Sequence, residues 1–421
     1  MPRNLLTADQ AAARLGVKVE TVYAYVSRGA LTRTVAEDGR TSRFDPAEVD
    51  ELAQRGRPRR DRRRAGSVEV TLATGITKLA DDRLAFRGHD VADLTRTATF
   101  EAVAELLWTA ELPSSADAAV WTVPDDARRL AAAVTAPLPA DAPAIERLAV
   151  VTAALAGADP LRVDRRPAAV ARVGRRLLTT FPTALPAAVA PDRSRRRGTA
   201  TRTGGGNRAT GAHRRVAAAL WPALSPLPAT RPRVRVLDAA LVLLADHELA
   251  TSTLAARVAA STRADPYAVV LAGLGAVAGP RHGTAAAASH RLFLDAEAGG
   301  SAERALAAAL ESSPTPPGFG HPVYRTADPR ATVLLDRLAS ICPRRAAATI
   351  DGVLAAGARL DAGPATVDAA LGAFAYATQM PVGATDAVFA VARTAGWIAH
   401  ALEEYGEAPL RFRARAVYTG E

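Results

Sequence analysis

The chain has 421 residues, a formal net charge of +10, a hydrophobic fraction of 49% and one cysteine. The hydrophobic fraction excludes a mainly disordered chain, and the length allows about two to four domains. Because Cys342 stands alone, a disulfide framework and a multi-cysteine metal site are excluded. The sequence lacks both an apolar run of about 18 residues and a signal-peptide core, so we expect a cytoplasmic protein with no membrane partner.

The positive charge is concentrated in two arginine-rich tracts. Residues 55–64 carry a net charge of +6 and residues 192–215 carry +7, so the remainder of the chain nets −3. The first tract lies in a predicted linker, residues 55–66. The second lacks an apolar period and is predicted to be a mobile surface loop, residues 192–215.

Residues 1–54 have the pattern of a winged helix-turn-helix. Thr7 and Gln10 form a capping box before a first helix, and a second helix is predicted over 19–28 with Gly29 as its C-cap. A hairpin is predicted over 32–44, turning at residues 38–39, and Asp45 opens a third helix. The sequence of residues 5–17 resembles the excisionase and MerR type of DNA-binding domain.

DNA is therefore a candidate partner, through residues 1–64. In the resembling domains the second helix would enter the major groove. Residues 1–54 net −1, however, and phosphate neutralisation supplies most non-specific affinity for DNA. The arginines of the linker could supply that charge, while a protein-docking or vestigial module remains the alternative.

The remainder of the chain is predicted to be mainly α-helical. Two short strands are expected at residues 68–71 and 83–86. Apolar periodicity then predicts helices over 100–111, 125–134, 145–155, 168–180, 237–262, 266–277, 302–309, 331–338, 343–356, 366–377 and 385–405.

Three of the seven histidines stand in unusual surroundings. His247 lies between two acids inside the helix predicted over 237–262. His282 lies at a Gly-Pro break between two helical segments, and His321 follows a glycine-rich loop. No pair of histidines has the spacing of metal ligands, so a zinc site is not expected.

Taken together and in order, these segments resemble the citrate synthase family. The resembling segments are 84–90, 99–108, 245–258, 264–267, 279–283, 318–330, 392–400 and 413–420. The resemblance covers residues 66–421 and is weakest over 115–235. It implies a large helical domain formed by residues 67–282 and 381–421, with a small domain of residues 283–380. It also implies a homodimer.

The resemblance implies condensation of acetyl-CoA with oxaloacetate, followed by hydrolysis of citryl-CoA. Acetyl-CoA is then a co-substrate, and no cofactor is bound permanently. Asp368 would be the base, because a thioester methyl group is a weak acid that needs a positioned base. His282, at a helix start that favours a neutral imidazole, would hydrogen-bond the thioester oxygen. His321 would polarise the oxaloacetate carbonyl and protonate the new alkoxide.

The resemblance also assigns binding residues. Arg330 and Arg393 would hold the carboxylates of oxaloacetate, with His247 in contact and Arg413 reaching in from the partner subunit; a forked guanidinium suits a carboxylate. Arg325, Gly318 and Gly320 would bind CoA. Closure of the small domain would exclude water.

Three departures from the family pattern leave the substrate open: Arg281, Pro322 and the pair Ala369 and Ala370 stand where other residue types are usual. A 2-methylcitrate synthase using propionyl-CoA is the close alternative, since one methylene is worth about 1–3 kcal/mol of discrimination. A DNA-binding regulator with a synthase-like sensor body and a catalytically inactive relative are the others.

Overall fold

The structure is a computed structural model that describes most of the chain. The described residues are 5–15, 17–27, 31–35, 41–46, 48–49, 70–80, 82–114, 121–188, 215–279, 282–283, 285–321, 323–324, 326–413 and 418. They fall into two compact units, Met1–Ala73 and Thr74–Glu421. Among the described residues, none of the helices has the length and apolar character needed to cross a bilayer.

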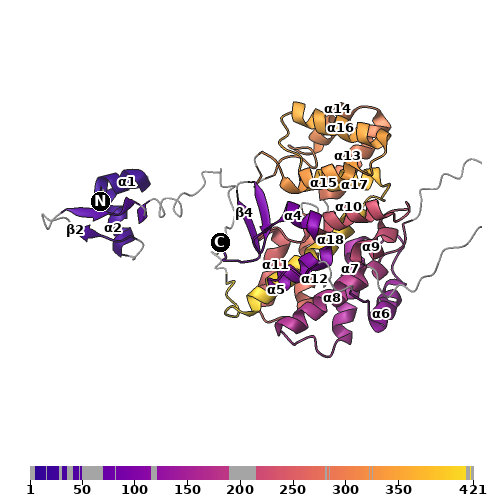
Figure 1. The fold of residues 1–421 in the computed structure, drawn as a ribbon, viewed down its shortest axis with the longest axis horizontal. Helices are drawn as coiled ribbons and strands as arrows, with labels where there is room; N and C mark the ends of the chain where they lie inside the picture. Colours follow the sequence, from indigo (N-terminus) through magenta and orange to yellow (C-terminus); the bar gives the residue numbers. More distant parts are fainter. Residues whose placement is uncertain are drawn as a thin grey trace, which may run out of the picture. The chain divides into compact units, whose positions relative to one another are not determined.

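Two short helices and a small antiparallel sheet are described in the first unit (Figure 1). The elements are β1 (Leu6–Thr7), α1 (Ala8–Leu15), α2 (Val19–Ser27), β2 (Thr34–Val35) and β3 (Ser42–Phe44). The strands have the order β1-β3-β2. A separate apolar core holds them together, with Ala11, Val22, Phe44 and Val49 among its buried members.

The structure confirms most of the predicted helix-turn-helix. The Thr7 Oγ1 atom accepts a hydrogen bond from the Gln10 amide (3.2 Å), and Gln10 Oε1 accepts one from the Thr7 amide (2.9 Å), as a capping box requires. The hairpin is present, with Thr34 opposite Arg43. Strand β1 was not predicted. Gly29, the turn at residues 38–39, the linker 55–66 and most of the third helix lie outside the described residues.

The second unit begins with a three-stranded hairpin sheet of β4 (Thr77–Ala80), β5 (Arg83–Phe86) and β6 (His89–Asp90). The strand predicted at 83–86 is confirmed, but the strand predicted at 68–71 as its partner is wrong. Val70 and Thr71 form no strand, and β4 pairs with β5 instead, with Leu79 opposite Leu84.

Helices form the remainder of this unit (Figure 1). One group is α4 (Val91–Thr97), α5 (Phe100–Thr109), α6 (Asp125–Thr135), α7 (Ala144–Ala158), α8 (Pro167–Ala184), α9 (Val216–Leu224), α10 (Arg231–Leu244), α11 (Thr251–Ser261), α12 (Pro266–Val277) and α18 (Ala384–Tyr405). The others are α13 (Ala285–Gly299), α14 (Ala302–Ser312), α15 (Pro329–Ala339), α16 (Arg344–Arg359) and α17 (Val367–Ala377). The mainly helical fold class is confirmed.

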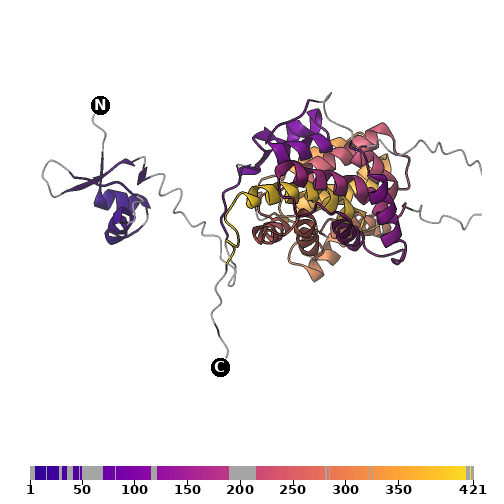
Figure 2. The ribbon, with the colours of Figure 1, turned by 90° about the horizontal axis from the view of Figure 1, so that it is seen from below.

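Helix α18 is the central element of the core. It packs against α5, α7, α8, α10, α11, α12, α13 and α17, and Figure 2 shows it running among the other helices. Its residues from Ala384 to Ala401 are nearly all buried, including Arg393 and His400. Alanines at many of its positions allow this close approach of neighbouring helices.

One predicted helix is wrong in a way that matters for function. Residues 237–262 form two helices, α10 and α11, separated by residues 245–250, and Glu248 there has a left-handed φ of 54°. The other predicted helices are present with small shifts at their ends, while α4, α9 and α13 were not predicted. The predicted loop 192–215 lies outside the described residues except for Arg215.

Candidate active site

The predicted catalytic residues lie around one cavity of about 280 Å³. Six of the predicted site residues line it together with neighbouring apolar and polar side chains. The lining consists of His247, Glu248, Leu249, Ala250, Thr251, His282, His321, Val323, Arg330, Val367, Asp368, Phe389 and Arg393. These residues come from the α10–α11 break and the start of α11, the α12–α13 turn, the loop before α15 and the start of α15, the start of α17, and α18.

His247 lies in the α10–α11 break and not in a helix, which corrects the prediction. Its Nε2 atom lies 2.9 Å from the Tyr324 hydroxyl, and its ring meets the His321 ring edge to face. Burial, assisted by the charges of Arg330 and Arg393, holds the pKa of His247 well below its ordinary value. The ring is therefore neutral at physiological pH and can donate or accept a hydrogen bond.

His282 is held by the N-terminus of α11. Its Nε2 atom accepts a hydrogen bond from the Ser252 amide (3.3 Å) and lies 2.8 Å from the Ser252 hydroxyl. Burial, with a smaller effect of Arg393, lowers the pKa of His282 to about 4. The neutral ring therefore carries its proton on Nδ1. The helix start that faces this imidazole is that of α11.

In His321 the protein binds Nδ1, whereas in His282 it binds Nε2. Its Nδ1 atom accepts hydrogen bonds from the amides of Val323 (3.1 Å) and Tyr324 (3.4 Å). Burial and then the charge of Arg330 lower the pKa of His321. A neutral His321 consequently carries its proton on Nε2 and can donate it.

The glycine loop before His321 is attached to the start of α17. The Gly318 carbonyl accepts hydrogen bonds from the Thr366 amide (2.8 Å) and hydroxyl (3.2 Å), and the Gly320 amide donates to the Pro364 carbonyl (3.0 Å). Both glycines have left-handed φ angles, of 84° and 69°. A Cβ atom on Gly318 would also lie 2.7 Å from Ser289 Oγ. The loop thus fixes His321 relative to Asp368.

Asp368 is the second residue of α17, and its amide donates to the Thr366 hydroxyl (3.2 Å) that caps the helix. Burial raises the pKa of Asp368 to about 6, although Arg330 and Arg393 oppose the rise. The carboxyl is therefore mostly ionised at pH 7, yet it binds a proton more strongly than an ordinary aspartate. Both properties suit a general base.

The two buried arginines have different partners. Arg330 donates to both carboxylate oxygens of Asp328, from Nε (3.0 Å) and Nη2 (2.8 Å), and stacks over Tyr324. Arg393 donates from Nε to the Leu244 carbonyl (2.9 Å), and its buried Nη1 atom has no hydrogen-bond partner among the described residues. Burial and the neighbouring Arg330 lower the pKa of Arg393 to about 10. A buried cationic donor without a partner is a binding point for an anion.

Two family models match the sequence of this chain. The family model described as "Citrate synthase, C-terminal domain" matches residues 67–415, and the model described as "Helix-turn-helix domain" matches residues 5–57. The chain belongs to the citrate synthase family. Both resemblances predicted from the sequence are thereby confirmed.

Relatives of known activity fall into two classes within the citrate synthase family. Citrate synthase 2 of Bacillus subtilis is 29% identical over 83% of this chain and 94% of its own length. A 2-methylcitrate synthase of Mycobacterium tuberculosis is 30% identical over 81% of this chain and 86% of its own length. These identities support a condensing enzyme without distinguishing the two acyl substrates.

Solved citrate synthases share the fold. The enzyme from Thermoplasma acidophilum, in a ternary complex with carboxymethyl coenzyme A and oxaloacetate, has a TM-score of 0.65. It is 23% identical and covers 84% of this chain and 94% of its own. Citrate synthase from Pyrobaculum aerophilum has a TM-score of 0.66 and is 24% identical, covering 84% of this chain and 91% of its own.

Three other predicted residues of this citrate synthase family member, Gly318, Gly320 and Arg413, are described but do not line the cavity. Arg413 is exposed near the C-terminus, and Gly318 and Gly320 are hydrogen-bonded to the segment that precedes α17. Arg325, and the departures Arg281 and Pro322, lie outside the described residues. Three partners of the site residues were not predicted from the sequence, although all lie in the segments that carry the family resemblance: Ser252, Tyr324 and Asp328.

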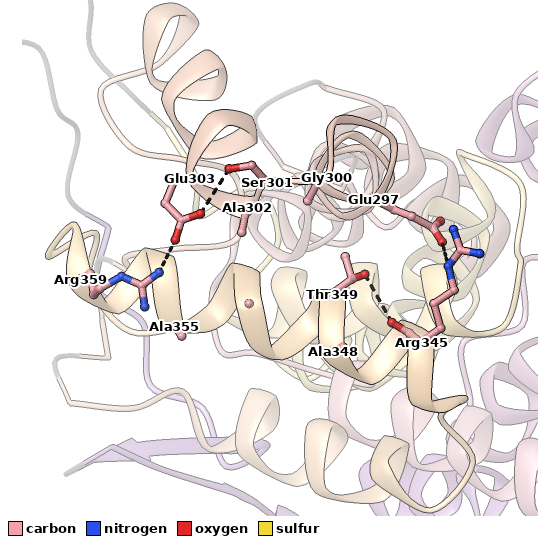
Figure 3. Close-up of a pocket in the computed structure, with 12 residues that line it drawn as sticks. Glu297, Gly300, Ser301, Ala302, Glu303, Arg345, Ala348, Thr349, Ala355 and Arg359 are labelled. Carbon is pink, nitrogen blue, oxygen red and sulfur yellow. Dashed lines mark hydrogen bonds and ion pairs between the residues drawn. The ribbon is translucent and has the colours of Figure 1, made fainter.

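A second pocket, of about 470 Å³, lies between α16 and the turn from α13 to α14 (Figure 3). Its charged side chains already pair with one another: Arg345 with Glu297 (2.9 Å) and Arg359 with Glu303. Ser301 is occupied as the cap of α14 and by Glu303. These pairs offer an incoming substrate no buried charge comparable to Arg393.

Proposed function

We propose that the protein condenses acetyl-CoA with oxaloacetate and hydrolyses the product to citrate and CoA. The observation that carries the proposal is the arrangement of Asp368, His282 and His321 around one cavity, each in the protonation state that its role requires. The unpaired Nη1 of Arg393 supplies a site for a carboxylate in the same cavity.

The first step is removal of a proton from the acyl methyl group. Asp368 accepts this proton, and the Nδ1–H of His282 donates a hydrogen bond to the thioester oxygen as negative charge develops there. His282 can do this because Ser252 occupies its other nitrogen. Because the ring is already neutral, losing its remaining proton would form an unfavourable imidazolate, so it hydrogen-bonds the oxygen of the enol without transferring that proton completely.

The second step forms the carbon–carbon bond. The enol carbon attacks the ketone carbon of oxaloacetate, and the Nε2–H of His321 polarises that ketone and then protonates the alkoxide. Arg330, Arg393 and His247 hold oxaloacetate. Water then attacks the thioester carbonyl of citryl-CoA, and the carbon–sulfur bond breaks to release CoA and citrate.

We further propose that the enzyme acts as a homodimer in which Arg413 completes the partner's oxaloacetate site. Arg325, Gly318 and Gly320 would contact CoA, and residues 283–380 would close over the substrates as a small domain. Closure would exclude water while the enol is exposed.

The alternative is a 2-methylcitrate synthase that uses propionyl-CoA, as the Mycobacterium tuberculosis relative's name states for that protein. Steady-state thiol release from acetyl-CoA and propionyl-CoA, each with oxaloacetate, separates the two. We expect the higher kcat/KM with acetyl-CoA. A preference for propionyl-CoA of about tenfold or more, which is within the discrimination available to one methylene, would replace the first proposal by the second. Absence of thiol release with either would exclude both and favour an inactive relative.

A second function, DNA binding through residues 1–64, is favoured by the match to a helix-turn-helix domain. The exposed residues of α2 are Glu20, Tyr23 and Ser27, so this helix presents no basic side chain. Phosphate contacts would have to come from the arginines of residues 55–64.

Fluorescence anisotropy with genomic DNA fragments at about 50 and 200 mM salt tests DNA binding. We expect binding by the full chain that weakens steeply with salt, and loss of binding when Arg59, Arg60 and Arg62 are all changed to Gln. No binding at the lower salt concentration would remove DNA as a partner.

A further inference from the structure

Asp246, beside His247, is a fully buried carboxylate that the proposed mechanism does not use. It accepts hydrogen bonds from the Thr77 hydroxyl (2.5 Å) and the Glu248 amide (3.1 Å), and His400 Nε2 lies 3.3 Å from it. The hydroxyl comes from β4, the amide from the α10–α11 break and the imidazole from α18. One carboxylate, on the residue before His247, therefore joins three separate elements.

The backbone on either side of Asp246 is also bound to α18. The Ala245 carbonyl accepts a hydrogen bond from the Gly396 amide (3.0 Å), and the Leu244 carbonyl accepts one from Arg393. A Cβ atom on Gly396 would lie 2.4 Å from Asp246 Oδ1, so the approach of the two segments depends on that glycine. The position of His247 is thus determined by contacts with α18.

His400 extends the contacts to α11. Arg257 Nη1 lies 3.0 Å from His400 Nδ1, and a guanidinium can only donate, so Nδ1 accepts. His400 consequently carries its proton on Nε2, the atom that faces Asp246. Arg257 has no exposed surface, and its charge is balanced by Glu403 and Glu404.

Glu404 then connects Arg257 to the C-terminal segment. It is fully buried and accepts hydrogen bonds from Arg257 Nε (3.0 Å) and from Arg411 Nε (2.7 Å) and Nη2 (2.6 Å). The Leu410 amide donates to the Ser261 carbonyl at the end of α11 (2.9 Å). Arg413 follows two residues after Arg411.

We propose that Asp246, His400, Arg257 and Glu404 are positioning residues that hold His247 and the segment carrying Arg413 on one rigid support. The inference rests on the proposed function, in which both His247 and Arg413 bind oxaloacetate. It adds that the two oxaloacetate-binding ends of one chain are joined through an unbroken series of side-chain contacts, buried from Asp246 to Glu404.

The chemistry of this series favours a positioning role over a purely stabilising one. Buried ion pairs often contribute no more to stability than apolar side chains of the same volume, because desolvation offsets their attraction. A buried polar network instead restricts its members to one arrangement, since each donor has a defined acceptor. Displacement of a substrate-binding group by about 1 Å can reduce the rate about a hundredfold.

Two substitutions test the proposal in the full-length protein. Asp246→Asn keeps the size of the side chain but places an amide opposite three donors. Glu404→Gln removes the charge shared by Arg257 and Arg411. The matched control is Glu407→Gln, because Glu407 also pairs with Arg411, at 3.7 Å, but is exposed. The measurements are kcat, the KM for each substrate, oxaloacetate binding by calorimetry, and thermal unfolding.

For both network variants we expect the KM and Kd for oxaloacetate to rise about tenfold or more, with the KM for the acyl-CoA changed less than about threefold. Glu407→Gln should behave as the wild type. If Asp246→Asn does not fold, Glu404→Gln decides the question. Network variants that unfold at lower temperature but keep the wild-type affinity for oxaloacetate would show a scaffold only, and the inference would be wrong. A wild type that neither binds oxaloacetate nor releases thiol would instead overturn the proposed function and, with it, the inference.

Discussion

The titratable groups of the cavity respond to burial in opposite directions, and both directions favour the proposed reaction. Burial disfavours the charged form of any group, so it lowers the pKa of His282 and raises that of Asp368. Arg330 and Arg393 lower the pKa of each group that they face, and they therefore assist the effect on the histidines but oppose it on Asp368. The result is two neutral proton donors beside a base of raised proton affinity.

A pH profile tests the role of Asp368. Because the base must be ionised and its pKa is raised to about 6, kcat/KM should fall as the pH decreases through about 6. His282, with a pKa of about 4, titrates below this range and should not shape it. Asp368→Asn should lower kcat by about 10²–10⁴-fold, as expected for loss of a general base.

Asp386 provides a matched control for that profile. Burial also raises its pKa to about 6, but it lies at the start of α18 outside the cavity. Asp386→Asn should therefore keep both the activity and the acid limb. An acid limb that disappears in Asp386→Asn, or a wild-type midpoint near the ordinary aspartate value of about 4, would contradict the assignment.

At the level of elements, local sequence signals predicted helices well wherever the ends of a helix are set by nearby residues. Helix α12 begins at the predicted Pro266, with Asp265 as its cap, and ends at Val277 as predicted. The capping box of α1 was likewise readable from Thr7 and Gln10. These boundaries depend on contacts within one turn, which a sequence pattern contains.

The break between α10 and α11 could not be predicted from local sequence, because distant residues impose it. Residues 237–262 are mostly good helix formers, with apolar spacing that continues through the break. Arg393 and Gly396 of α18 donate hydrogen bonds to the carbonyls of residues 244 and 245, respectively. Thr77 of β4 donates one to the carboxylate of Asp246. The family resemblance identified His247 as a site residue, but only the fold explains why a loop is needed there.

Partners of the site residues were missed for the same reason. Ser252 lies thirty positions before His282, and nothing in the sequence connects the two until α11 and the α12–α13 turn are placed together. Asp328, in contrast, is two residues from Arg330, and their pairing was within reach of the sequence. Separation along the chain therefore decided which contacts could be anticipated.

At the level of the whole molecule, the net charge of +10 says little about the catalytic unit. The excess lies in the tracts 55–64 and 192–215, whereas the cavity uses individual arginines with defined partners. The buried Nη1 atom of Arg393 has no hydrogen-bond partner in the described part of the site, an arrangement that a surface of diffuse positive charge could not provide.

The proposed exchange of Arg413 between subunits can be tested by mixing two inactive variants. Arg413→Ala lacks the oxaloacetate ligand and Asp368→Asn lacks the base, so each homodimer should be nearly inactive. In a mixed dimer, the Arg413→Ala subunit keeps Asp368 and receives Arg413 from its partner, which restores one complete site. Random reassociation of equal amounts should recover about a quarter of the wild-type rate of thiol release, because half of the dimers are mixed and each has one complete site. If Arg413 served its own subunit, every site in the mixture would lack one group and no activity would return.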